Sequence, residues 1–191
     1  LPLTLFPYTT LFRSLSNEDE EFQKKINFGV FPGSQGGPLM HVIAAKAVCF
    51  KEAMTDDFVN YQKQIIKNAK SMCEDFQKLG FETVQPQTDN HLLLLDLRNK
   101  NITGKDAEEL LGKVNITLNK NSIPNDPESP FVTSGVRIGT AAVTTRGFKE
   151  KECSEIVKLI GEAIENKDKP EILQKVKMKA ADLCSKFPVY K

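Results

Sequence analysis

Several features that would assign this chain to a particular class are missing from its sequence. It has no run of about 18 apolar residues, so it predicts no membrane-spanning helix. Its 26 Lys and Arg residues nearly equal its 25 Asp and Glu residues, which excludes both a basic surface for nucleic acid and an acidic tail. A hydrophobic content of 40% still supports a folded core within 191 residues.

Residues suited to disulfides or metal ions are few and widely spaced. The cysteines include no C-x-x-C pair, which is typical of reduced thiols in a cytoplasmic protein. His41 and His91 have no Cys, His or Asp at metal-ligand spacing, so we expect no metal site. No nucleophile with an adjacent base is evident either. The cysteines are Cys49, Cys73, Cys153 and Cys184.

Hydrophobic periodicity predicts helices around a small sheet, which is an α/β layered domain. The clearest helix covers residues 56–79, where apolar residues recur every three or four positions before Gly80 ends it. The strand at 91–97 is apolar enough to be covered on both faces. Residues 15–25 are polar and indicate a surface helix or loop. Further helices are predicted at 41–54, 103–113, 148–166 and 170–187, and further strands at 81–84, 116–119 and 136–140.

Arg137 is the strongest single candidate for a ligand contact. The Val-Arg-Ile run around it is bounded by glycines and predicts a buried or half-buried strand. An unpaired charge would be costly there, so we expect an anionic partner. The planar guanidinium suits a carboxylate or phosphate held by two parallel hydrogen bonds. The alternative is an internal ion pair with one of the 25 acidic residues.

Two loops offer further binding groups. The glycines from Gly33 to Gly37 precede a predicted helix, where backbone N–H groups and the positive helix end would cradle an anion. This loop lacks a Walker lysine, and a tight turn is the alternative. Asn119 and Asn121 precede a proline-rich loop at 124–130 and offer amide groups to a heterocyclic ligand. Their alternative role is to cap the loop's own backbone.

A series of short motifs also occurs in a fixed order. They are FPGSQGGP at 31–38, TDNH at 88–91, TLNKN at 117–121, SPF at 129–131 and GVRIGT at 135–140. From about residue 22 to residue 191 the chain closely resembles serine hydroxymethyltransferase, a family of pyridoxal-phosphate enzymes that interconvert serine and glycine with tetrahydrofolate. The closing FPVY at 187–190 resembles the bacterial form. The resemblance implies a fold-type I transferase.

The resemblance also implies roles for particular residues. Gly36 and Gly37 would reach across a dimer interface to the cofactor phosphate of the other subunit. Arg137 would hold the carboxylate of the amino-acid substrate. Pyridoxal 5'-phosphate would be the cofactor and tetrahydrofolate the co-substrate, in a cytoplasmic homodimer or tetramer. The residues expected to contact folate are Asn121, Ser129, Pro130 and Phe131.

The family's Schiff-base lysine has no counterpart in this chain. Its Thr-Thr-Thr-Thr-His-Lys motif does not precede Leu15, and none of the chain's lysines stands in such a motif. The family's ring-stacking histidine, its aspartate on the pyridine nitrogen and its acid/base glutamate are also unmatched. We therefore assign no catalytic residue. We expect a carboxyl-terminal part of the enzyme that does not catalyse the reaction alone.

The expected organisation has three parts. Residues 1–14 are apolar without a helical or strand period, and we interpret them as a non-native segment. Residues 15–54 would be the end of the large pyridoxal-phosphate domain with an interdomain helix, and 55–191 the small domain. Two other functions stay open: a non-catalytic partner-binding domain, and another fold-type I enzyme such as an aminotransferase. The folate-type loop argues against the aminotransferase.

Overall fold

The structure is a computed structural model that describes residues 20–189. The chain divides into two compact units between Glu52 and Ala53, where the sequence predicted a division between residues 54 and 55. Residues 1–14, interpreted as non-native, lie outside the described residues, as does Tyr190 of the closing motif. Each unit is described by itself below.

From residue 20 onward, the first unit contains two helices, α2 (Glu20–Val30) and α3 (Met40–Ala53), joined by the loop at 31–39. Helix α2 begins within the polar segment predicted as a surface helix or loop and continues through the apolar residues that follow it. Helix α3 begins and ends within one residue of its predicted bounds. Neither helix buries a side chain, although α3 carries apolar residues on all sides. Such a helix is normally covered by other elements.

The second unit is organised around its longest helix, α4 (Asp56–Lys78). Thr55 caps its start by accepting a hydrogen bond from the Phe58 N–H at 3.3 Å, and Gly80 follows its end with a φ of 72°. The predicted apolar stripe is confirmed in the middle of the helix, whereas its end members Phe58 and Leu79 are exposed. The buried residues of α4 are Ile65, Asn68, Ala69, Met72, Cys73 and Phe76.

Four short antiparallel strands form one sheet in the order β1-β2-β4-β3. This sheet confirms the predicted α/β class. The third strand begins later than the predicted 116–119, because Leu118 is buried in the core and pairing starts only after it. The strands are β1 (Glu82–Thr83), β2 (Leu92–Asp96), β3 (Asn119–Asn121) and β4 (Gly135–Gly139).

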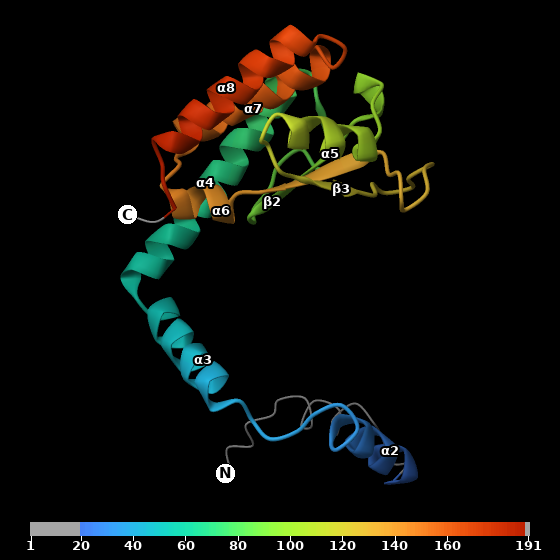
Figure 1. Ribbon diagram of the computed structural model, residues 1–191, viewed down its shortest axis with the longest axis vertical. Coiled ribbons are helices and arrows are strands. Elements are labelled where there is room, and N and C mark those ends of the chain that lie inside the picture. Colours follow the sequence, from blue (N-terminus) through green and yellow to red (C-terminus); the bar gives the residue numbers. More distant parts are fainter. Residues whose placement is uncertain (1–19, 190–191) are drawn as a thin grey trace. The chain divides into compact units, whose positions relative to one another are not determined.

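The remaining helices cover the sheet and α4. Figure 1 shows α7 and α8 side by side; α7 contacts both α4 and α8, and α5 contacts β3 and β4. Helix α6 and the short helix η1 have no counterpart in the prediction, because both are too short for a periodic pattern. Within residues 20–189, no helix is both long and apolar enough to span a membrane. These elements are η1 (Arg98–Lys100), α5 (Gly104–Lys113), α6 (Ala141–Arg146), α7 (Glu150–Glu165) and α8 (Pro170–Ser185).

The sheet has one covered face and one open face. Leu93 and Leu95 of β2 are buried in the core that α4, α5 and α7 complete, whereas Leu94 between them is only half-buried. Successive side chains of a strand point to opposite faces, so Leu94 belongs to the open face. The expectation that this strand is covered on both faces is therefore wrong for the described residues. The helices that contact the sheet pack on the face of Leu93 and Leu95.

The two faces predict different costs for neighbouring leucines. Leu95→Ala should lower the free energy of unfolding by about 2–5 kcal/mol, because Leu95 is fully buried and its removal leaves a cavity. Leu94→Ala, the matched change on the open face, should cost less than about half of that. Urea unfolding followed by circular dichroism measures both values. Equal costs would mean that the open face is covered as well.

Candidate functional site

Arg137 lies in the middle of β4 and is exposed on the open face. It pairs with Leu94 on β2 and with Asn119 on β3, which puts these side chains on the same face. The prediction of a strand is confirmed, but the prediction of a buried or half-buried arginine is wrong. Because strand residues alternate between faces, Val136 and Ile138 are buried on the covered side and Arg137 is not.

Arg137 also has no anionic partner within the described part of the chain. The ion pairs formed among residues 20–189 do not include it, and it makes no side-chain hydrogen bond there. The alternative of an internal ion pair is therefore not realised among these residues. The guanidinium keeps all its donors available for an external anion.

A cavity of about 230 Å³ lies beside Arg137. Arg137 and Asn121 line it together, so two of the predicted site residues come to one place. The sequence assigned no role to Thr88 and Asn90 of the TDNH motif, and both line this cavity as well. The other lining residues are Cys73, Thr83, Val84, Gln85, Gln87, Leu92, Leu93 and Leu94.

The turn before β2 is fixed by hydrogen bonds of its own side chains. The Thr88 hydroxyl donates to the Leu92 carbonyl at 2.6 Å, and the Asn90 side-chain carbonyl accepts from the Leu92 N–H at 2.8 Å. The bond from Leu92 occupies the side-chain carbonyl of Asn90. The NH₂ group of Asn90 forms no hydrogen bond with residues 20–189. The cavity beside Arg137 is therefore bordered by a pre-organised polar turn.

Asn121 is held close to β4 by the glycine that precedes Val136. A Cβ atom at Gly135 would come within 2.9 Å of the Asn121 carbonyl and 2.6 Å of the Leu95 carbonyl, so the three strands meet where only glycine fits. The Asn121 amide donates to the Ser122 carbonyl at 2.7 Å, which realises the backbone-capping alternative for its NH₂ group. Its side-chain carbonyl stays available to a ligand.

The proline-rich loop between β3 and β4 is organised by Asp126. Its carboxylate accepts hydrogen bonds from the Ser134 hydroxyl at 2.6 Å and from the backbone N–H groups of Ile123, Glu128 and Ser134. Burial alone would raise the pKa of this carboxyl, but the four hydrogen bonds that the carboxylate accepts hold its pKa well below its ordinary value. The loop therefore has a fixed, charge-centred geometry.

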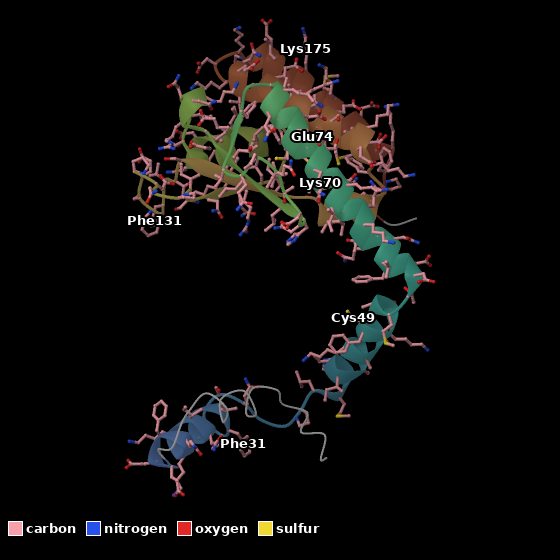
Figure 2. All side chains as sticks on the ribbon, turned by 180° about the vertical axis from the view of Figure 1, so that it is seen from behind. Phe31, Cys49, Lys70, Glu74, Phe131 and Lys175 are labelled. Atoms are coloured by element: carbon pink, nitrogen blue, oxygen red, sulfur yellow. The ribbon has the colours of Figure 1, made fainter. Side chains whose placement is uncertain are left out.

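The folate-type residues of this loop lie away from the cavity beside Arg137. Ser129, Pro130 and Phe131 are exposed, and Phe131 is 83% exposed. Figure 2 shows the labelled Phe131 at the outer end of the loop, away from the helices. They do not line the cavity that Arg137 and Asn121 share. Within the second unit, the structure thus brings together only part of the predicted set.

Gly36 and Gly37 lie in the exposed loop between α2 and α3 of the first unit. Their backbone N–H groups donate to no described residue, and no atom lies within 4 Å of where a Cβ would stand. Free N–H groups on an uncrowded loop fit the binding of a phosphate by main-chain donors. They fit a solvent-exposed turn equally well.

The cysteines and histidines form no further site among the described residues. All four cysteines are free, and burial raises the pKa of the Cys153 thiol to about 12, which favours its protonated form over the nucleophilic thiolate. His41 and His91 are exposed. No group of three or more metal-ligating side chains occurs in residues 20–189.

Comparison with known proteins identifies the class to which this domain belongs. A family model of serine hydroxymethyltransferase, a family of pyridoxal-phosphate-dependent transferases of fold type I, matches residues 11–160. The chain belongs to the serine hydroxymethyltransferase family. The match begins within the segment interpreted as non-native. The alternative of an aminotransferase finds no support in this family assignment.

Bacterial relatives agree with the family model. Serine hydroxymethyltransferases of Acinetobacter baumannii strain AYE and of Marinobacter nauticus are each 56% identical to this chain over 176 residues. The matches cover 92% of this chain and 42% of each relative. The chain therefore spans less than half the length of the curated relatives that it matches.

Proposed function

We propose that this chain forms the amino-acid-binding part of a serine hydroxymethyltransferase. The enzyme would reversibly convert serine and tetrahydrofolate to glycine and 5,10-methylenetetrahydrofolate. The observation that carries the proposal is the Arg137 guanidinium, which has no acidic partner among residues 20–189 and lies beside a cavity that Asn121 also lines. Two parallel N–H donors match the two oxygens of a substrate carboxylate.

Arg137 would act by orientation. A carboxylate gripped by two hydrogen bonds cannot rotate freely, so the grip fixes which bond at the α-carbon is presented for reaction. Pyridoxal phosphate, when bound, supplies an electron sink for that bond. The N–H groups of Gly36 and Gly37 would donate to its phosphate in a second subunit. Residues proposed to contact folate are Asn121, Ser129, Pro130 and Phe131.

The role of Arg137 predicts a specific loss of substrate affinity. In a full-length enzyme carrying these residues, Arg137→Ala should weaken serine binding by about 2–5 kcal/mol, because one partner of a close charge pair is removed. Arg137→Lys should recover only part of the lost affinity. Lysine keeps the positive charge but cannot donate two parallel hydrogen bonds to the carboxylate. Calorimetric titration of serine measures these affinities, and cofactor binding should persist.

A second arginine provides the control for this experiment. Arg98 forms an ion pair with Asp96 at 2.6 Å and does not line the cavity beside Arg137. Arg98→Ala should therefore leave serine affinity nearly unchanged. A serine affinity that survives Arg137→Ala would defeat the carboxylate assignment.

We further propose that this chain alone does not catalyse the reaction. No lysine of the chain stands in the family's Schiff-base motif, so the cofactor lacks its covalent attachment. Purified chain incubated with pyridoxal phosphate, serine and tetrahydrofolate should form glycine only at the background rate. A full-length relative in the same assay is the positive control. Turnover by the chain, together with borohydride trapping of cofactor at one lysine, would overturn this prediction.

A second candidate function is binding of a partner chain through the first unit. Helices α2 and α3 bury no side chain, and apolar residues all around a helix are typical of one that other elements cover. Exposed apolar patches of this kind mark interaction sites. The occupant that fits the proposed enzyme is a second subunit. The exposed apolar residues include Phe28, Phe31, Leu39, Met40, Val48 and Phe50.

This surface predicts self-association that one charge would weaken. Phe50 is 66% exposed on α3, and Phe50→Glu should shift the chain from dimer toward monomer, because a carboxylate would be desolvated at the interface. Met178 of α8 is an apolar residue with nearly the same exposure, so Met178→Glu is the matched control. It should leave the molecular mass of the assembly in solution unchanged. Size-exclusion chromatography with light scattering measures both. A monomeric wild-type chain would contradict the proposal.

A further inference from the structure

A second cavity, of about 140 Å³, lies on the helix-covered side of the sheet, away from the face of Arg137. Its walls are mostly apolar and come from α4, the segment 115–118 before β3, β4, α6, α7 and α8. An engineered apolar cavity of about 150 Å³ is known to hold one benzene molecule. The space therefore suits one six-membered ring or a short branched chain. Side chains that line it include Ile138, Val143, Leu159, Ala180 and Leu183.

One cation, Arg146, lines this cavity and has no counter-ion in the described part of the chain. Arg146, the last residue of α6, donates from Nη2 to the Cys184 carbonyl at 2.8 Å, and this is its hydrogen bond to the protein. Its Nε atom is buried and has no hydrogen-bond partner among the residues that the structure describes. The ion pairs among residues 20–189 do not include Arg146. A buried donor without an acceptor is costly, so the site lacks an anionic or strongly accepting group.

We propose that this cavity binds a small apolar carboxylate, with its ring or branched chain among the apolar walls and its carboxylate on Arg146. Guanidinium and carboxylate match as two parallel hydrogen bonds, one of which would use the unpaired Nε–H. The ligand has a way in, because the exposed residues Asn115 and Thr117 also line the cavity. This inference does not rest on the proposed function of Arg137.

The position of the cavity relates it to the strand that carries Arg137. Ile138 and Gly139 line it from β4, and the side chain of Ile138 lies on the face of that strand opposite Arg137. A bound ligand would thus contact β4 on the face opposite the Arg137 side chain. The two cavities both border β4 but have no lining residue in common.

Benzoate is the probe that matches this space and charge. Titration of the chain with benzoate, followed by methyl NMR spectra, should shift signals of Ile138 and Val143 and leave those of Leu94 on the open face unchanged. Benzyl alcohol, which keeps the ring without the charge, should bind at least about tenfold more weakly, and so should acetate, which keeps the charge without the ring. Shifts centred on Leu94, or equal binding of benzyl alcohol, would overturn the proposal.

Three variants separate the cavity from the rest of the surface. Ala180→Leu should fill the cavity with Arg146 intact and abolish benzoate binding, and Arg146→Met should reduce it to the level of benzyl alcohol. Arg137→Gln should leave benzoate affinity unchanged. Loss of binding in Arg137→Gln but not in Arg146→Met would place benzoate at the candidate substrate site and refute the inference. If Ala180→Leu does not fold, the wild-type methyl shifts and the benzyl alcohol comparison decide the matter.

Discussion

The alternation of side chains across a sheet that is covered on one face determines most of what this chain can do. Leu93, Leu95, Val136 and Ile138 enter the core on one side. The same alternation puts Arg137 on the open side together with its neighbours in adjacent strands. A single pattern of strand pairing thus builds the core and exposes the guanidinium of Arg137. A register slip by one residue would turn the apolar side chains outward and Arg137 toward the core.

The loops are the second constraint on the candidate site, because they set the positions of the polar groups that border the open face of the sheet. Asp126 gathers four hydrogen-bond donors and holds the proline-rich loop. Thr88 and Asn90 likewise fix the turn before β2 with short bonds to Leu92. Gly135 lets the strands approach where a side chain would collide with two carbonyl groups. Rigid loops beside an open sheet face are a suitable frame for binding a small polar molecule.

The sequence predicted the long elements well and their surroundings poorly. Helices such as α4, α7 and α8 bury an apolar stripe that a period of 3.6 reveals, so their bounds came within about two residues. Helix α6 has only six residues and no periodic signal. The position of β3 depended on Leu118 entering the core, and the exposure of Arg137 depended on which face the helices cover. Both are tertiary facts that no local pattern contains, and the TDNH motif by itself gave no role to Thr88 and Asn90.

The contrast between two arginines shows how far a local rule extends. A guanidinium in a buried apolar segment requires an anionic partner, but Arg137 is exposed. Nine residues further on, Arg146 follows Val-Thr-Thr in a segment that gave no signal, and it is this arginine whose Nε is buried without a partner. A buried donor does need a partner, but the sheet and the short helix α6 determine that Arg146, and not Arg137, carries the buried donor. Within residues 20–189, Arg137 on the open face of β4 and Arg146 beside the cavity behind it both lack an acidic partner, a feature that only the three-dimensional structure reveals.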